Sequence, residues 1–113
     1  MQTIIRQILF HLDRSMAAYK LYASEKKYYQ ALRIYKANKD VYFLLTNHAD
    51  LWKESETLVI EYLFHLEDWF EQFDELVRTK NPALENEFIF TRLEGSPAFP
   101  SGIYQAIKNT GTL

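Results

Sequence analysis

Apolar residues recur every three to four positions through most of the chain before Pro82, which is the spacing of one face of an α-helix. The first run predicts a long amphipathic helix that ends near Ser24 and Glu25. A serine at this point can cap the free N–H groups of the helix that follows. The apolar face of the first helix comprises Ile5, Ile8, Leu9, Leu12, Met16, Tyr19 and Ala23.

A second helix is expected after Ser24, with an apolar stripe formed by Tyr28, Ala31, Leu32 and Tyr35. The pattern predicts a break near Asn38–Asp40, because Asn and Asp favour caps and turns. The apolar run Val41–Leu45 suits either a buried helical turn or a short strand. We favour helix, since no hairpin turn lies nearby.

The strongest periodicity predicts a third helix over Leu51–Val77, capped by Asp50 alone or by Asn47 with Asp50. The helix is expected to end at Asn81–Pro82, because the residue before a proline is pushed out of helical geometry. Its wide apolar face comprises Leu58, Val59, Tyr62, Leu63, Leu66, Trp69, Phe70, Phe73, Leu76 and Val77.

The composition changes at Pro82, because all three prolines and all three glycines lie in residues 82–113. Within this stretch, Glu87–Leu93 has an extended pattern, and Ser101 can cap a short helix that runs through Lys108. We therefore expect an all-α fold: a three-helix antiparallel up-down bundle over residues 1–81, with short connections between neighbouring helices. An irregular C-terminal arm, residues 82–113, is expected to carry one short helix and pack on the bundle within a single domain.

Composition excludes several classes of protein. The net charge is only −2 and aromatic residues make up 16% of the chain, which argues against intrinsic disorder. The absence of cysteine excludes disulfide scaffolds and thiolate zinc sites, and it fits a reducing compartment. No run approaches the roughly 20 apolar residues that cross a bilayer, and the N-terminus lacks a signal-peptide pattern. We expect a cytoplasmic protein without membrane contact or cofactor.

Charge is divided unevenly along the chain. Residues 1–39 hold eight basic and two acidic residues, a net charge of +6, whereas residues 40–113 carry −8. Nine acidic residues and one lysine lie between Asp50 and Glu75. One interpretation is that the basic helices and the acidic helix pair across the seams of a bundle, where each exposed ion pair contributes about 0–1 kcal/mol.

In two other interpretations, the charged residues bind other molecules. The basic helices could bind a phosphate backbone or another anion, with Tyr28 or Tyr29 available for stacking; the candidate residues are Lys20, Lys26, Lys27, Arg33 and Lys36. The charges could instead serve partner recognition, either in head-to-tail self-assembly or in docking of another protein. Two apolar residues on the polar side of the acidic helix support this interpretation. The candidate interface residues are Ile60, Phe64, Glu67 and Glu71.

The three histidines offer little metal-binding geometry. Glu61, His65 and Asp68 share one helical face and could ligate a metal together with His11. Di-iron bundles use paired Glu-x-x-His motifs, whereas this chain has a single Glu-x-x-x-His. We expect no metal site, with these histidines bonded to neighbouring carboxylates.

Two short stretches resemble known families. Arg6-Gln-Ile-Leu-Phe-His11 is similar to the Arg-x4–6-His motif of the HEPN ribonucleases, and this resemblance implies that Arg6 and His11 act together on a scissile phosphate. Lys27–Lys36 resembles the second helix of a tetratricopeptide unit through Tyr28, Ala31 and Tyr35. No second repeat follows one repeat length further on, so we interpret Ala31 as a tight helix–helix contact.

The function we favour from the sequence is a small, non-enzymatic, cytoplasmic module that contacts another protein or a second copy of itself. A homodimer is one form of that contact, because the helix over Leu51–Val77 is apolar around much of its circumference between Leu58 and Phe70. Binding of nucleic acid or anions by the basic helices, and a HEPN-like ribonuclease using Arg6 and His11, are the alternatives.

Overall fold

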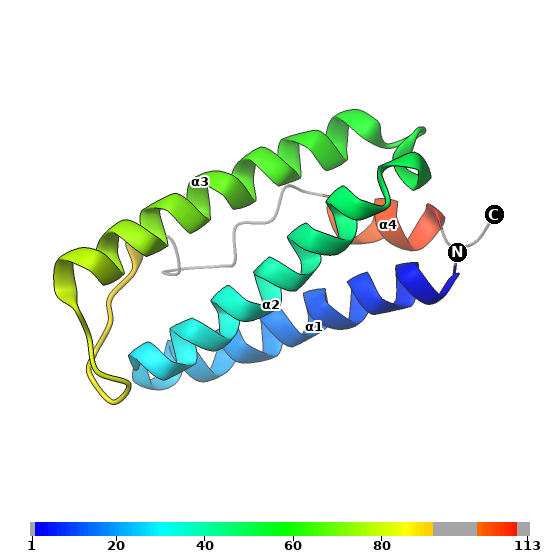
Figure 1. Cartoon of the computed structure of the whole chain (residues 1–113). Coiled ribbons are helices and arrows are strands. Elements are labelled where there is room, and N and C mark those ends of the chain that lie inside the picture. The colour runs from blue at the N-terminus through cyan, green and yellow to red at the C-terminus, as the bar shows by residue number, and fades with distance from the viewer. Residues whose placement is uncertain (1, 92–101, 111–113) are drawn as a thin grey trace.

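The computed structural model describes residues 2–91 and 102–110, and these residues are all-helical apart from their connections. Four α-helices are present in the described part: α1 (Gln2–Glu25), α2 (Tyr28–Asn47), α3 (Glu56–Lys80) and α4 (Ile103–Thr110). A single 3-10 turn, η1 (Ala49–Trp52), separates α2 from α3. Figure 1 shows α1 and α2 side by side, α3 along the other side of the molecule, and α4 against the N-terminal half of α1.

Antiparallel packing of α1 and α2 is fixed by polar contacts at their middle. The hydroxyl of Ser15 donates a 2.8 Å hydrogen bond to Oδ1 of Asn38, and both residues are buried. Asn38 therefore satisfies its side chain on the neighbouring helix and leaves the backbone of α2 intact. The predicted break at Asn38–Asp40 is wrong for this reason, and Val41–Leu45 is helical.

The first helix ends at Glu25, as predicted, but Ser24 does not cap the helix that follows. Ser24 is still helical, and its hydroxyl donates back to the carbonyl of Leu21. The cap of α2 is Lys27, whose N–H donates to the side-chain oxygen of Gln30. Lys26 makes the turn with a left-handed φ of 54°. The buried stripe of α1 includes Ser15, Ala18 and Tyr22, whereas Met16 is half-buried and Ala23 is exposed.

The third helix begins at Glu56, five residues later than predicted, because the preceding residues form a turn. Trp52 is buried, and its indole N–H donates a 2.9 Å hydrogen bond to the carbonyl of Leu45 at the end of α2. Asn47 and Asp50 consequently do not cap α3, and the cap position belongs to Ser55. At the other end, Asn81 adopts a left-handed φ of 43° and terminates the helix before Pro82, as predicted.

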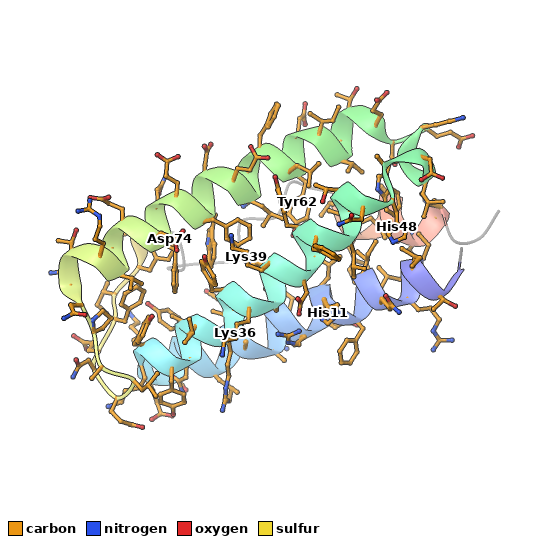
Figure 2. All side chains as sticks on the ribbon, in the orientation of Figure 1. His11, Lys36, Lys39, His48, Tyr62 and Asp74 are labelled. Atoms are coloured by element: carbon orange, nitrogen blue, oxygen red, sulfur yellow. The ribbon has the colours of Figure 1, made fainter. Side chains whose placement is uncertain are left out.

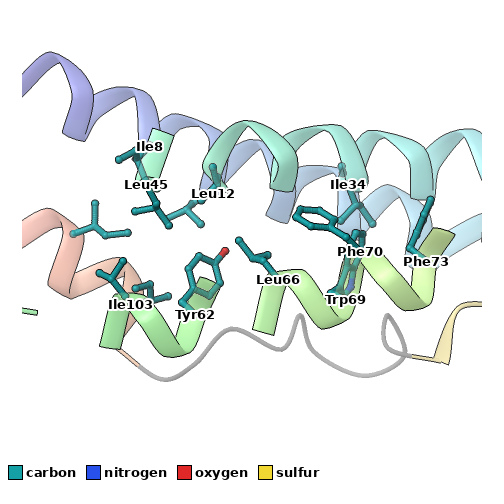
Figure 3. Packing of buried hydrophobic residues seen from close by; sticks show 14 of the residues in the cluster. Ile8, Leu12, Ile34, Leu45, Tyr62, Leu66, Trp69, Phe70, Phe73 and Ile103 are labelled. Carbon is teal, nitrogen blue, oxygen red and sulfur yellow. The ribbon is translucent and has the colours of Figure 1, made fainter. Parts of the chain in front are cut away.

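The core is aromatic where α2 meets α3 and aliphatic near α4. Figure 3 shows Ile8 and Leu12 of α1, Leu45 of α2 and Ile103 of α4 in the part of the core that contains Tyr62 and Leu66 of α3. Toward the other end, Trp69 stacks on Phe73 with ring centroids 5.2 Å apart, and Tyr35 of α2 packs against both. Such pairs add roughly 0.5–1.5 kcal/mol each beyond the burial of their surface.

The chain after α3 returns to the α1–α2 turn. The N–H of Phe88 donates to the carbonyl of Lys26, and the hydroxyl of Tyr22 donates to the carbonyl of Phe88. Phe88 and Phe90 point inward while Ile89 is exposed, which agrees with the extended pattern predicted from Glu87 onward. Arg92, Leu93 and Ser101 lie outside the described residues. The predicted final short helix is present as α4.

Burial raises the pKa of Tyr104 on α4. The charge of Asp13 on α1 and a hydrogen bond to Asp13 raise it further, so this contact joins α4 to α1.

Among the helices of the described segments, none combines the length and the apolar content needed to cross a bilayer.

Candidate interaction surfaces

Two apolar side chains project from the side of α3 that faces away from the core. Phe64 is 60% exposed and Ile60 is 40% exposed, whereas Tyr62 and Leu66 between and beside them are buried. Exposed carboxylates surround Phe64 at the helical neighbour positions, namely Glu61, Glu67 and Asp68, and Glu71 follows one turn further on. We call this surface, formed by Ile60, Glu61, Phe64, Glu67, Asp68 and Glu71, the acidic face.

Glu67 has a contact inside the molecule as well. The hydroxyl of Tyr42 on α2 donates a 2.7 Å hydrogen bond to Oε2 of Glu67, and this bond, with burial and the carboxylate charge, raises the pKa of Tyr42. Glu67 therefore lies at the edge of the acidic face nearest α2. Glu71 and Phe64 lie further out, so the predicted interface residues combine one structural carboxylate with exposed groups.

A second tyrosine makes an equivalent contact one helical repeat further along the seam. Burial, together with a hydrogen bond to Asp74 and its charge, raises the pKa of Tyr35 to about 12. The ammonium of Lys39 lies 4.2 Å from the centroid of the Phe70 ring and 5.3 Å from that of Tyr35. Figure 2 labels Lys39 and Asp74 on the facing helices α2 and α3. Hydroxyl–carboxylate and cation–π contacts thus join these helices.

Ion pairs do not link the basic and acidic helices in the described part of the chain. The pairs found there are Arg14 with Asp40 at 2.8 Å, His11 with Asp40 at 3.9 Å, and Arg78 with Glu75. The first two join α1 to α2, and the third lies within α3. The expected pairing of the basic helices with the acidic helix is therefore not formed, and most of the charge on both sides faces outward.

The five predicted anion-binding residues are spread over two helices and a turn. Lys20 is exposed on α1, and Arg33 and Lys36 are exposed on α2, with the guanidinium of Arg33 5.5 Å from the centroid of the Tyr29 ring. Lys26 and Lys27 are half-buried at the turn. The backbone of Lys27 pairs there with the backbone of Glu87 in an isolated antiparallel β-bridge. The structure does not gather all five on one helix face.

His11 is contacted by an arginine other than the predicted one. Nη1 of Arg14 donates to Nδ1 of His11 at 2.8 Å and to Oδ2 of Asp40 at 2.8 Å. Arg6 is exposed, and five positions along a helix place it about 140° around the axis from His11. His11 and Arg14 are three residues apart, about one helical turn, and this spacing is the sequence feature that could have predicted their contact.

The predicted metal ligands are not assembled into a site. Across the segments the structure describes, no three His, Asp or Glu side chains are placed to hold a metal ion together. His65 is half-buried and stacks on Tyr62, with ring centroids 6.2 Å apart. His11 is held by Arg14 instead of approaching Glu61, His65 and Asp68. His48 ends α2, and its carbonyl accepts the N–H of Leu51.

Sequence reasoning missed two further exposed aromatic residues. Phe10 on α1 is 63% exposed and Phe43 on α2 is 64% exposed. Phe43 lies within the apolar run Val41–Leu45, where Val41 and Leu45 are buried, so a continuous run conceals its orientation. Phe10 directly follows Ile8 and Leu9 in the sequence, so adjacent apolar residues conceal its exposure in the same way.

Comparison of the chain with models of protein families, with curated proteins and with solved structures finds no match.

Proposed function

We propose that the chain is a small, non-enzymatic helical module of the cytoplasm that binds another protein through the acidic face of α3. The observation that carries this proposal is Phe64, an aromatic side chain left 60% exposed with carboxylates at three of its four neighbouring positions on the helix. An apolar centre inside a polar rim is the usual composition of a protein contact. Burial of one such side chain contributes about 1.5–3 kcal/mol, and aromatic residues are frequent among interface hot spots.

The charge of the acidic face defines the chemistry of its partner. Glu61, Asp68 and Glu71 form no ion pair within the described residues, so their charges are available to a partner. A homodimer in which two acidic faces meet would bring like charges together, and such contacts cost several kcal/mol. A partner surface that presents basic groups around an apolar centre suits the acidic face better.

The proposal takes the fold as a three-helix antiparallel up-down bundle, residues 1–81, with a C-terminal arm, residues 82–113, that packs on it. The antiparallel register of α1 and α2, the aromatic seam between α2 and α3, and the contacts of Phe88 and α4 support this assignment. The bundle holds α3 rigidly, which keeps Ile60 and Phe64 in place for a partner.

The two alternative functions have weaker support. An anion-binding surface would use Lys20, Lys26, Lys27, Arg33 and Lys36, but two of these lysines are half-buried at a turn. The ribonuclease alternative pairs Arg6 with His11, whereas His11 is bonded to Arg14 and Arg6 lies about 140° around the helix axis from it. Loss of RNA cleavage in His11→Ala would support the ribonuclease, and salt-sensitive RNA binding would support the anion site.

Quantitative co-purification from the native cells tests the proposed function. We expect tagged full-length chain to retain a protein partner, the variant Phe64→Ser to lose it, and Leu84→Ser to retain it. Leu84 is a matched control, because it is 57% exposed and lies outside the acidic face. Equal recovery of every bound protein by the three forms would contradict the proposal.

A further inference from the structure

Phe10 and Phe43 are the most exposed large hydrophobic residues in the described part of the chain, and the acidic face uses neither. They belong to the two helices that carry the excess of basic residues. Burying exposed phenylalanines against a partner is favourable, so their common position on the surface needs an explanation.

The register of α1 and α2 brings the two phenylalanines to the same level of the helix pair. Arg14 of α1 contacts Asp40 of α2 at 2.8 Å, on the exposed side of the helix pair. Phe10 lies one turn before Arg14, and Phe43 lies about one turn after Asp40. Because the helices are antiparallel, both steps lead in the same direction along the helix pair. Phe10 and Phe43 therefore lie at the same level on the outer surface of α1 and α2.

Basic residues lie on the same outer surface of α1 and α2 as the two phenylalanines. Arg6 lies one turn from Phe10, and Arg33 and Lys36 are exposed on the outer side of α2. Figure 2 shows Lys36 on the α1–α2 side of the molecule. Two carboxylates lie among these residues: Asp40, which pairs with Arg14, and Asp13, one turn from Phe10, which is hydrogen-bonded to Tyr104 of α4. We call Arg6, Phe10, Arg14, Arg33, Lys36 and Phe43 the basic face.

The basic and acidic faces point in opposite directions. The buried sides of α1 and α2 are turned toward α3, and the buried side of α3 is turned toward them. The remaining sides, which bear the two faces, are accordingly on opposite surfaces of the molecule. One face can bind a neighbour without obstructing the other.

We propose that the basic face is the docking site for the acidic face of a second copy of this chain. This inference rests on the proposed function and names the partner. Each face has an exposed aromatic centre, and their charges are opposite, which favours the pair over wrong partners.

The molecule is large enough for this contact. An ordinary stable interface covers about 800 Å² on each partner, and the accessible surface of the chain is 6881 Å². With extents of 45 × 22 × 22 Å, one long side supplies that area. Because the two faces differ and lie on opposite sides, the contact is head-to-tail, and successive copies form an open chain or a ring.

Mixing two variants tests the inference by sedimentation velocity. Wild-type protein is expected to assemble as its concentration rises, with the assembly weakened by high salt. Phe64→Ser lacks the acidic contact and Phe43→Ser lacks the basic one, so each alone should associate at least about 10-fold more weakly. Their equimolar mixture should form a one-to-one dimer through the two intact faces, and Leu84→Ser should behave as wild type.

Other outcomes separate this inference from the proposed function. If Phe43→Ser still dimerises alone and the mixture adds nothing, the acidic face pairs with itself and the inference is overturned. A wild-type monomer at every concentration, with co-purification of a foreign protein that depends on Phe64, overturns the inference and leaves the proposed function standing. Binding of RNA or anionic vesicles by monomeric wild type, lost in Phe43→Ser, also overturns it. Loss of Phe64-dependent co-purification removes the proposed function itself.

Discussion

Ser15 on α1 and Asn38 on α2 form a hydrogen bond of 2.8 Å between buried side chains, twenty-three residues apart in the sequence. The bond satisfies two polar groups that would otherwise be costly to bury, and it fixes the register of the two helices. The same register places Phe10 and Phe43 at one level of the outer surface of α1 and α2, so this contact links the interior to the proposed docking surface.

Removing one partner of this bond should destabilise the protein more than removing both. Ser15→Ala leaves Oδ1 of Asn38 buried without its donor, and we expect a loss of about 1–3 kcal/mol in the free energy of unfolding. The double variant Ser15→Ala with Asn38→Leu should lose clearly less than the sum of the two single changes. Urea denaturation in a double-mutant cycle measures this, and strictly additive losses would contradict the role of the bond.

Alkaline pH should destabilise the seam between α2 and α3. The folded-state pKa of Tyr35 is raised to about 12 from its ordinary value of 10.0, mainly by burial and then by the hydrogen bond to Asp74 and its charge. The stabilising contribution is therefore complete below pH 10 and is lost as the pH rises toward 12. Tyr35→Phe, which cannot ionise, should show a shallower loss of unfolding free energy across that window. An unchanged pH profile in Tyr35→Phe would contradict this assignment.

The left-handed turn at Lys26 should tolerate glycine better than lysine. Lys26 has a φ of 54°, a conformation that costs a residue with a side chain about 1–2 kcal/mol. Glycine removes that strain but gains freedom in the unfolded chain, worth about 0.5–1 kcal/mol. We expect Lys26→Gly to stabilise the fold by about 0.5 kcal/mol and Lys27→Gly, at an extended φ of −88°, to destabilise it. Thermal unfolding compares the two, and the reverse order would be evidence against strain at Lys26.

A larger side chain at position 31 should destabilise the protein. It is completely buried in α2, and extra methylene groups in a packed core cost about 1–3 kcal/mol. Ala31→Leu is therefore expected to lower the midpoint of urea unfolding, whereas Ala23→Leu, at an exposed position of α1, should leave it nearly unchanged. Equal midpoints for both variants would show that a larger side chain fits at position 31 without loss of stability, which would contradict tight packing there.

The periodicity of the sequence predicts helix existence well, because residues such as Ile8, Leu66 and Phe73 repeat at the helical spacing and are all buried. The ends of the helices are less predictable, since they depend on distant partners. Asn38 looks like a helix breaker until Ser15 is placed beside it, and Leu51 looks helical until Trp52 turns back to Leu45.

For exposed residues too, the sequence predicts what depends on helical spacing and not what depends on contacts with other helices. Ile60 and Phe64 interrupt a charged face, so their helical spacing alone predicts the exposure that the structure shows. Phe43 is different, because it lies in a continuous apolar run and its outward direction depends on which side of α2 meets α1 and α3. The contact of Arg14 with His11 similarly depends on Asp40, which approaches from another helix.

The most direct test of the acidic face as a protein contact is photo-crosslinking from position 64 in native cells. A photoreactive phenylalanine analogue would replace Phe64 in one variant and Leu84 in a control of similar exposure. We predict a discrete protein adduct from position 64, at least about 10-fold stronger than from position 84, and weakened when Glu71→Lys reverses a charge beside it. Equal adducts from both positions, or none from position 64, would contradict the assignment of α3 as the contact surface.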